Sequence, residues 1–242
     1  MQLTIVIPTY NEAENLPNLV SAIFSLPLPS VRILVVDDNS PDGTWKVARA
    51  LEQQYPGRFF AIVRPGKLGL GSAYLLGFRQ ALAMDSQAVA QMDADFSHPP
   101  EKLPQLLQTL QECDVVLGSR YVPGGKLDEQ WSIWRKSLSA FGNIYARNIL
   151  RLPIRDVTGG YRVWRRETLE GMPLEQIGSN GYAFQIEMIY VAYRLGYSFR
   201  ELPIHFAERG RGSSKMSLAI QVEAAWRVWQ FLFKYRDLAP PS

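Results

Sequence analysis

The strongest constraint on the fold is a regular alternation of short apolar segments with longer amphipathic ones. The apolar segments are rich in Val, Ile and Leu and span residues 3–8, 31–37, 59–63, 88–92 and 114–118. Between them lie stretches with helical length and pattern, at about 12–25, 42–55, 70–84 and 100–112. Strands that alternate with helices form a mainly parallel sheet, and continuous apolar runs indicate strands buried on both faces. The sequence therefore predicts an α/β fold.

The second half of the chain is less regular, and no linker separates it from the first. It contains helical stretches at about 131–151, 183–195 and 216–236, and a glycine-rich turn at 159–160 that leads into a strand. A further strand is expected at 197–206, followed by a basic, glycine-containing loop at 208–215. We expect one domain at 1–217, with the C-terminal amphipathic helix and tail, 218–242, belonging to the same domain.

The last predicted helix carries a single apolar stripe. Its members are Leu218, Val222, Trp226, Trp229 and Phe233, with polar and charged residues opposite. Such a stripe is typical of a helix packed on its own domain, but Trp and Phe beside Lys and Arg are also typical of a helix lying in a membrane interface. The two interpretations are compatible.

Composition excludes several classes of protein. Twenty-six basic and 23 acidic residues leave a net charge of +3, which is too small to indicate nucleic-acid binding. A single cysteine, Cys113, excludes an internal disulfide and a multi-cysteine zinc site, and favours a reducing compartment. The first residues lack the pattern of a signal peptide, and no apolar run reaches the length of a membrane span. We therefore expect a cytoplasmic location.

Carboxylates follow three of the predicted strands. Glu12 follows the first strand, Asp38 the second, and Asp93 and Asp95 the fourth. Ligands of open parallel sheets bind at the carboxyl ends of the strands, so these groups converge on the ligand side. An Asp-x-Asp pair alone is often only a helix cap, but its convergence with two other carboxylates predicts a Mg²⁺ site that also takes substrate phosphates.

Two further loops have open interpretations. In the run at 37–43, Ser40 or Asp42 is expected to cap the following helix, and one of the paired aspartates to accept hydrogen bonds from a base or ribose. The glycines at 66–71 match neither a phosphate-binding loop nor a dinucleotide fingerprint, so they are weak evidence for a site.

Basic residues dominate the second half. Arg120 follows the fifth strand, Arg135 lies in the next helix, and Arg209, Arg211 and Lys215 lie in the glycine-containing loop, which has the composition of a mobile lid. Together they suit the clamping of phosphate oxygens. His98 and His205 have neither metal-ligand spacing nor a nucleophile motif to serve.

The motifs together resemble a known family. They are Pro-Thr-Tyr-Asn-Glu at 8–12, Val-Asp-Asp-Asn-Ser-Pro-Asp-Gly-Thr at 36–44, Asp-Ala-Asp at 93–95, Gly-Ser-Arg-Tyr at 118–121 and the segment 209–217. In this order they resemble family 2 glycosyltransferases of the GT-A fold, specifically the dolichol-phosphate or polyprenol-phosphate mannosyltransferases. The resemblance spans about residues 3–217 and implies a Rossmann-like GT-A domain.

For the donor, GDP-mannose, the resemblance implies a set of binding residues. The guanosine end would be held by Pro8, Tyr10, Glu12, Val36 and Asp38, and the nucleotide would also contact Asp93, Ala94 and Asp95. Asp93 and Asp95 would bind a divalent cation, Mg²⁺ or Mn²⁺, with Ser97 at the position of a third ligand, through an intervening water. Arg209 and Lys215 would close over the diphosphate.

For the acceptor, a polyprenyl or dolichyl phosphate, the resemblance implies that Arg120, Arg135 and Ser139 hold the phosphate. Asp95, Arg120 and Arg135 are the expected catalytic residues. A lipid phosphate is already largely dianionic at pH 7, so it needs no general base. One in-line displacement on an α-linked donor would give an inverted, β-linked product. Attachment to the cytoplasmic face of a membrane would fall to the helices at 131–151 and 216–236 or to an anchoring partner protein.

Three other functions are compatible with parts of this pattern. A sibling enzyme would move glucose from UDP-glucose to the same lipid phosphate. A sugar nucleotidyltransferase shares the α/β pattern, but it would carry a glycine-rich basic loop where residues 8–12 stand. A non-catalytic, membrane-associated homologue would have a degraded metal site, whereas Asp93 and Asp95 are both present.

Overall fold

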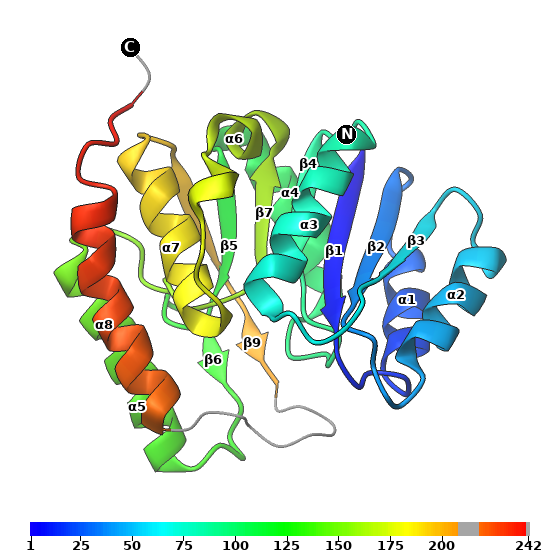
Figure 1. The fold of residues 1–242 in the computed structure, drawn as a ribbon, viewed down its shortest axis with the longest axis horizontal. Coiled ribbons are helices and arrows are strands. Elements are labelled where there is room, and N and C mark those ends of the chain that lie inside the picture. The colour runs from blue at the N-terminus through cyan, green and yellow to red at the C-terminus, as the bar shows by residue number, and fades with distance from the viewer. Residues whose placement is uncertain (208–217, 241–242) are drawn as a thin grey trace.

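The centre of the molecule is a seven-stranded sheet with helices on both faces (Figure 1). The structure, a computed structural model, describes residues 1–207 and 218–240, and the side chains of 218–224 are not described. The strand order is β3-β2-β1-β4-β7-β5-β8. The strands are β1 (Leu3–Thr9), β2 (Val31–Asp37), β3 (Phe59–Val63), β4 (Ala88–Gln91), β5 (Val115–Ser119), β7 (Arg162–Arg165) and β8 (Phe199–Pro203). The predicted α/β class and the five early strands are confirmed.

Helices connect and cover these strands. They are α1 (Leu16–Phe24), α2 (Thr44–Gln54), α3 (Leu70–Ala83), α4 (Leu103–Thr109), α5 (Ile133–Ile149), α6 (Arg166–Gly171), α7 (Gly181–Arg194) and α8 (Leu218–Lys234). Short 3-10 turns lie at Pro100–Lys102, Leu110–Glu112 and Leu174–Gln176. The short helix α6 carries no clear amphipathic signal and was not expected.

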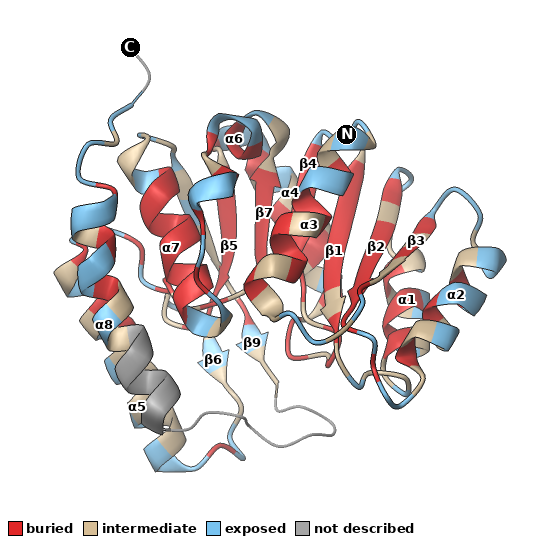
Figure 2. Cartoon of the chain, viewed as in Figure 1, coloured by how far each residue is buried: buried red, intermediate tan, exposed pale blue. Residues whose placement is uncertain are grey.

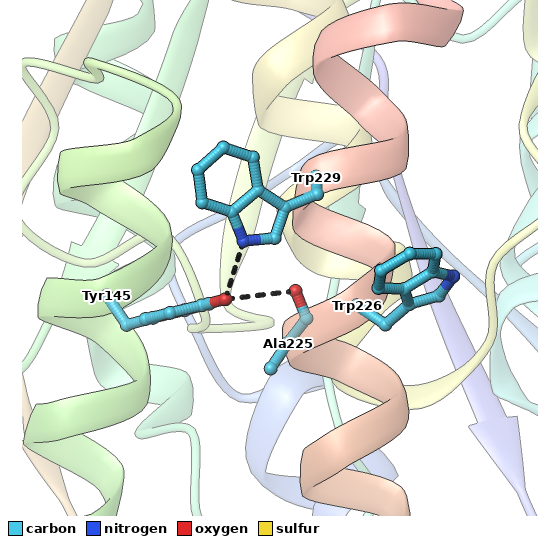
Figure 3. A pocket seen from close by; sticks show the side chains of 4 residues that line it. All are labelled: Tyr145, Ala225, Trp226 and Trp229. Atoms are coloured by element: carbon cyan, nitrogen blue, oxygen red, sulfur yellow. Dashed lines mark hydrogen bonds between the residues drawn. The ribbon is translucent and has the colours of Figure 1, made fainter.

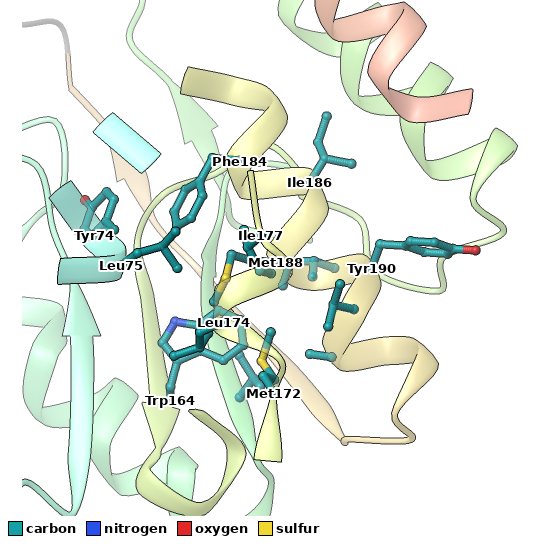
Figure 4. Close-up of a cluster of buried hydrophobic side chains, with 14 of the residues drawn as sticks. Tyr74, Leu75, Trp164, Met172, Leu174, Ile177, Phe184, Ile186, Met188 and Tyr190 are labelled. Carbon is teal, nitrogen blue, oxygen red and sulfur yellow. The ribbon is translucent and has the colours of Figure 1, made fainter. Parts of the chain in front are cut away.

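Alternate residues of each central strand enter two separate cores, one on each face of the sheet. Ile5 and Ile33 pack with α1, α2 and α4, whereas Val6 and Leu34 pack with α3 and α7. The second core, which includes Trp164 and Phe184, is drawn in Figure 4, and Figure 2 shows both cores as buried. Burial on both faces is the physical reason that these strands read as continuous apolar runs.

One strand departs from the parallel arrangement. β7 runs antiparallel to β4 and to β5, and all the other pairings in the sheet are parallel. The register of Arg162 with Gln91 and Leu117 shows that the chain enters β7 from the carboxyl edge of its neighbours. The segment just before β7 therefore lies at the edge where ligands bind in this type of sheet.

A small second sheet was not predicted. β6 (Lys126–Leu127) pairs in parallel with β9 (His205–Phe206). The single strand expected at 197–206 is therefore two strands, because Ser119–Pro203 is the last pair of the main sheet and His205 joins β6 instead. The amide of Lys126 donates to the carbonyl of Ile204 at 2.9 Å. This switch fixes the position of Phe206.

The described members of the apolar stripe predicted on the last helix, Trp226, Trp229 and Phe233, are exposed. α8 buries Val228 and Phe231, followed by Tyr235, against α7 and α5, whereas Trp226 and Phe233 of the stripe are exposed. The aliphatic members at 218 and 222 lie outside the described side chains. For the described residues, the interpretation that this stripe packs on its own domain was therefore wrong, because a second set of apolar residues at spacings of 3 and 4 forms the contact. The interpretation that the stripe lies in a membrane interface stays a prediction. That α8 and the tail share the domain of 1–217 stays a prediction, which this packing supports.

Two helices, α5 and α8, carry several large apolar side chains that are exposed. We call this set the apolar outer face; its members are Ile133, Trp134, Phe141, Ile144, Trp226, Trp229 and Phe233. Scattered exposed apolar residues need no explanation, but a set on two adjacent helices indicates an interaction surface. Within the described ranges, no helix has the length and hydropathy needed to cross a membrane.

Candidate active site

A cavity of about 270 Å³ lies at the carboxyl ends of β1, β2 and β4, where the loops after these strands meet the start of α3. Its wall is formed by Pro8, Thr9, Tyr10, Glu12, Asp38, Lys67, Gly69, Leu70, Ala73, Asp93, Ala94 and Asp95. We call it the strand-end cavity. Seven of these residues were predicted from the sequence as donor-binding residues, and the fold brings all seven to one wall.

The loop after β1 is held by side chains of the loop after β2. Three amides donate to these side chains: Asn11 N to Ser40 Oγ at 3.1 Å, Glu12 N to Thr44 Oγ1 at 2.9 Å, and Ala13 N to Asp42 Oδ2 at 3.0 Å. Gly43, with a φ of 86°, is the N-cap residue of α2, so neither Ser40 nor Asp42 occupies that position. Asp42 still serves the start of the helix, because its Oδ1 accepts from the amide of Thr44, the first residue of α2, at 2.9 Å. The same side chains also fix the cavity wall.

Asp37 and Asp38 have different environments. Asp37 is fully buried and accepts from the Thr9 hydroxyl at 2.8 Å and from the amide and hydroxyl of Ser40 at 2.9 and 2.6 Å. It therefore has a structural role beneath the cavity. Asp38 lines the cavity, and its environment is set by a buried arginine.

Asp38 forms a buried ion pair with Arg64. Arg64 also donates to Ser72 Oγ at 2.7 Å and to the Gly69 carbonyl at 2.9 Å. The amides of Leu68 and Gly69 donate to Asp38 Oδ2 at 3.2 and 3.1 Å. Both carboxylate oxygens are thus engaged, so Asp38 organises the wall and fixes the start of α3.

The segment at 66–71, whose glycines are only weak evidence for a site in the sequence, therefore belongs to the cavity. Lys67, Gly69 and Leu70 line it, and the ammonium of Lys67 lies 4.1 Å from the centroid of the Tyr10 ring. α3 reaches this position because Gly77 permits close packing on β1, where an added Cβ would meet Val6 Cγ1 at 2.2 Å. The sequence feature that marks this part of the cavity is the start of α3 next to Lys67, and not a glycine-rich fingerprint.

Asp93 is positioned by two aromatic side chains. The hydroxyl of Tyr74 donates to Asp93 Oδ1 at 3.3 Å, and the Asp93 amide donates to His98 Nδ1 at 3.0 Å. Burial, together with the nearby Asp93 carboxylate, holds the pKa of Tyr74 well above its ordinary value, so the hydroxyl stays a donor. Burial also lowers the pKa of His98, although Asp93 and Asp95 favour its charged form.

The predicted metal ligands suit a hard divalent cation. Asp93 and Asp95 offer only oxygen atoms, and Asp95 Oδ1 accepts from the Ser97 amide at 3.0 Å. The buried hydroxyl of Ser97 has no hydrogen-bond partner among the described residues. In the same part of the chain, no group of three or more His, Cys, Asp or Glu side chains is arranged to hold a metal. Two carboxylates fit a Mg²⁺-type ion that takes its other ligands from water and substrate phosphates.

A second polar group, centred on Arg120, lies next to the cavity. Arg120 forms a buried, bidentate ion pair with Asp156, with Nε to Oδ2 at 2.8 Å and Nη2 to Oδ1 at 2.7 Å. Nη2 also donates to Thr158 Oγ1 at 2.8 Å. Burial alone would raise the pKa of Asp156. The charge of the Arg120 guanidinium and the hydrogen bonds from the amides of Arg120 and Gly159 have the larger, opposite effect, so the pKa of Asp156 lies below its ordinary value.

Helix α5 adds the other predicted acceptor residues. Ser139 Oγ lies 2.8 Å from the hydroxyl of Tyr121, which follows Arg120 in the chain. Arg135 lies over the indole ring of Trp131 at 3.6 Å, one turn before Ser139 on the helix. We call Arg120, Tyr121, Arg135, Ser139 and Asp156 the arginine cluster.

Phe206 joins the two parts of the site. Its ring lies 5.6 Å from that of His98, 5.3 Å from the guanidinium of Arg120 and 5.8 Å from the ring of Trp131. His98 in turn stacks on Tyr161 with centroids 4.9 Å apart. A continuous set of ring contacts therefore runs from the Asp93 loop to the arginine cluster.

The structure does not bring every predicted residue to the cavity. Val36 is buried in β2, and neither it nor Ser97 belongs to the described cavity wall. Arg209 and Lys215 lie outside the described residues. Sequence reasoning missed Arg64, Asp156, Trp131 and Phe206, which act through contacts between distant segments and leave no local motif. His98 was set aside as lacking a catalytic pattern, yet it supports the Asp93 loop.

Comparison with known proteins identifies the class. Residues 4–172 match the family described as glycosyl transferase family 2. This chain therefore belongs to glycosyl transferase family 2, and its mainly parallel sheet with the added helices is the GT-A fold.

Two relatives are similar over nearly the whole chain. The polyprenol monophosphomannose synthase of Mycolicibacterium smegmatis is 45% identical over 225 residues, which cover 93% of this chain and 84% of the relative. The undecaprenyl-phosphate mannosyltransferase of Micrococcus luteus is 44% identical over 242 residues, which cover 98% of both chains.

Solved structures support the fold. A crystal structure of a mycobacterial protein has a TM-score of 0.68 at 18% identity and covers 100% of this chain and 76% of its own. Glucosyl-3-phosphoglycerate synthase from Mycobacterium tuberculosis, in complex with Mn²⁺, UDP-glucose and phosphoglyceric acid, has a TM-score of 0.67 at 16% identity and covers 100% of this chain and 81% of its own. At this identity the likeness concerns the fold alone.

Proposed function

We propose that this protein transfers mannose from GDP-mannose to a polyprenyl or dolichyl monophosphate, with inversion. The observation that carries the proposal is the pairing of a carboxylate-lined nucleotide cavity with an adjacent arginine cluster, in a chain 44–45% identical to two enzymes named for mannosyl transfer to lipid phosphates. The cavity would take the sugar nucleotide, and the arginine cluster the acceptor phosphate.

The donor end of the proposal rests on the walls of the strand-end cavity. Tyr10 and Lys67 would contact the base from one side, and Pro8 and Glu12 would complete the nucleoside pocket. The pair Asp38 and Arg64 would act by keeping this wall rigid, because both Asp38 oxygens already accept from the protein. Arg209 and Lys215 remain proposed ligands of the diphosphate.

Asp93 and Asp95 would hold the divalent cation, Mg²⁺ or Mn²⁺, with Ser97 reaching it through water. When bound, the cation would neutralise diphosphate charge and stabilise GDP as the leaving group. Tyr74 and His98 would keep Asp93 in place through the hydroxyl and the ring nitrogen described above. Such outer contacts commonly set the orientation of carboxylate ligands.

The acceptor chemistry needs no general base. A phosphate monoester has a second pKa near 6, so it is mostly dianionic at pH 7. An acceptor phosphate oxygen would form a bond to C1 of mannose while the bond from C1 to the β-phosphate oxygen breaks and its electron pair leaves with GDP. No proton has to move. Arg120 and Arg135 would orient the acceptor and offset the repulsion between two anions, with Ser139 donating a hydrogen bond.

Contact with a membrane follows from the nature of the acceptor. The apolar outer face of α5 and α8 combines Trp, Phe and Ile side chains that are exposed in the structure. Aromatic and aliphatic groups on an amphipathic helix are what interfacial helices insert below the lipid headgroups. We therefore propose peripheral attachment to the cytoplasmic face of a membrane through this face, with an anchoring partner protein as the other route.

A transfer assay tests the proposal. Purified protein would be incubated with GDP-mannose, Mg²⁺ and a polyprenyl phosphate, and radiolabelled mannose would be followed into the organic phase. Asp95→Asn should lower the rate roughly a thousandfold, because it removes a metal-binding charge. It keeps an acceptor for the Ser97 amide. The matched control, Asp237→Asn, changes an exposed carboxylate and should transfer at the wild-type rate.

The same assay separates the rival functions. Transfer from UDP-glucose but not from GDP-mannose would keep the mechanism and overturn the donor. Absence of transfer from either donor, with folded protein and vesicles as well as detergent tested, would favour the non-catalytic homologue. Retention of full activity by Asp95→Asn would overturn the proposed metal site.

A further inference from the structure

Arg162 differs from the other polar groups inside this fold. Even in the open groove between α5 and α8, polar atoms bond to one another: the indole N–H of Trp229 donates to the Tyr145 hydroxyl at 2.9 Å, and this hydroxyl donates to the Ala225 carbonyl at 3.3 Å (Figure 3). Arg162 is fully buried on β7, and its Nε has no hydrogen-bond partner among the described residues. Burying a charge is unfavourable unless the charge is paired, so the presence of Arg162 needs a physical reason.

The hydrogen bonds that Arg162 does make go to neutral groups. Its Nη1 donates to the carbonyl of Gln185 at 2.8 Å, and its Nη2 donates to the carbonyl of Val157 at 3.0 Å. In the described part of the chain, no carboxylate forms an ion pair with it. Burial lowers the pKa of Arg162 to about 9, so the guanidinium is still charged at pH 7. No direct partner cancels this charge.

Arg162 lies at the carboxyl edge of the sheet, next to the arginine cluster. It is the first residue of β7 and pairs with Gln91, the last residue of β4. The carbonyl that its Nη2 binds belongs to Val157, which follows Asp156 in the chain. Besides burial, the Asp156 carboxylate and the Arg120 guanidinium act on the pKa of Arg162 in opposite directions, so both charges are near it.

The charge of Arg162 changes what the arginine cluster can attract. The bidentate pair of Arg120 with Asp156 is neutral as a unit, because its two charges lie in direct contact. With Arg162 the buried group has two positive charges and one negative charge, so it attracts an anion. Away from bulk water, such an excess charge acts more strongly on a ligand than it would at the surface. Asp93 and Asp95 would be compensated by the divalent cation of the proposed function.

We propose that Arg162 is a positioning residue for the acceptor phosphate, because its buried charge supplies the excess positive charge that the pair of Arg120 with Asp156 lacks. The inference rests on the proposed function and deepens its acceptor site. Arg162 acts through the field of its charge and not through contact with the phosphate. Arg120 can then share its guanidinium between Asp156 and an acceptor oxygen.

Substitutions on β7 separate charge from packing. Arg162→Gln removes the charge and keeps an N–H donor, whereas Arg162→Lys keeps both the charge and a donor. Arg165→Gln is the matched control: Arg165 also donates to backbone carbonyls, those of Cys113 at 2.7 Å and Gln111 at 2.8 Å, but it pairs with Ala88 at the opposite edge of the sheet. Circular dichroism with thermal melting would show which variants fold, and Arg162→Met replaces Arg162→Gln if the latter does not.

The primary measurement is calorimetric binding of two short ligands at pH 7.5. Geranyl phosphate is mostly a dianion at this pH, and geranyl methyl phosphate has the same chain and one negative charge. We expect Arg162→Gln to weaken the first about tenfold and the second about threefold, because half the ligand charge gives half the change in binding free energy. Arg162→Lys and Arg165→Gln should stay within about twofold of the wild type for both ligands.

The transfer assay gives a second readout. Arg162→Gln should raise KM for the lipid phosphate about tenfold and leave KM for GDP-mannose unchanged. Failure of mannose transfer together with the expected binding of the two ligands would reject the proposed function and keep the role of Arg162 in phosphate binding.

Three results would overturn the proposal. Equal weakening of the two ligands by Arg162→Gln would show that Arg162 shapes the site and does not act through its charge. Equal losses in Arg162→Lys and Arg162→Gln would show the same. A loss of geranyl phosphate binding in Arg165→Gln as large as in Arg162→Gln would show a general effect of weakening β7.

Discussion

The strand-end cavity and the arginine cluster lie side by side but are built in different ways. The cavity uses short loops at the ends of three strands that are neighbours in the sheet, β2, β1 and β4, and most of its supporting bonds come from backbone amides. The arginine cluster draws on residues just after β5, on α5 and on the segment before β7, and its centre is the bidentate pair of Arg120 with Asp156. The first region is therefore held mainly by loops that the parallel strands bring together, and the second mainly by one buried ion pair.

This difference predicts that the two regions respond differently to substitution. A change in the cavity should affect mainly the donor, because the parallel strands and the bonds between their neighbouring loops hold this region together. A change in the arginine cluster should affect both stability and the acceptor, because one buried ion pair joins separate segments. The predictions below run from the largest expected effect to the smallest.

Asp156→Asn should have the largest effect on stability. It leaves the buried guanidinium of Arg120 without its counter-charge, and breaking one partner of such a pair costs about 3–5 kcal/mol. The Tm should fall by roughly 6–20 °C for a chain of this size. Thermal melting by circular dichroism at pH 7 measures it, with Asp237→Asn expected to melt like the wild type. A wild-type Tm for Asp156→Asn would show that the cluster is not held by this pair.

The same pair predicts a pH dependence. The pKa of Asp156 in the folded state lies below its ordinary value, so its stabilising contribution is complete above the unfolded pKa of about 3.9. This contribution is lost as the pH falls through the folded pKa. The difference in Tm between the wild type and Asp156→Asn should therefore be constant from about pH 7 to 5 and shrink below about pH 4. A difference that grows on acidification would contradict the assignment.

Arg64→Lys should act on the donor alone. Lysine keeps the charge beside Asp38 but lacks the planar fork that reaches Asp38, Ser72 and the Gly69 carbonyl together. Loss of one charge-assisted bond corresponds to roughly a tenfold rise in KM for GDP-mannose. Initial rates at saturating lipid measure it. An equal rise in KM for the lipid phosphate would break the proposed independence of the two regions.

Tyr121→Phe should give the smallest effect. It removes the hydroxyl that bonds to Ser139 and leaves the ring beside Arg120 in place. A single neutral hydrogen bond contributes about 0.5–1.5 kcal/mol, so KM for the acceptor should rise about two- to tenfold. Tyr55→Phe, on the opposite side of the fold beside Phe24, is the control. No change in acceptor KM would show that Ser139 is positioned without Tyr121.

Much of the fold could be predicted from the sequence, because a strand buried on both faces is a continuous run of apolar residues that can be recognised in each strand by itself. β2 and β3 were predicted with their observed bounds, and β1 within one residue. The short β6 and α6 were not predicted, since two paired residues or a six-residue helix carry no usable period. The sequence also placed Asp93 and Asp95 correctly at the end of β4, since a loop that follows a parallel strand has only one edge to occupy.

The sequence by itself determined the α/β class, the strand ends that bear carboxylates, and membership of a glycosyltransferase family, because these depend on local pattern. Only the tertiary structure decided that Asp38 pairs with Arg64, that Arg120 pairs with Asp156, and that Trp226 faces outward. Each of these depends on which distant segment packs against the residue. A helix with two apolar stripes, such as α8, can bury either of them. Packing against α7 and α5 determines which stripe is buried.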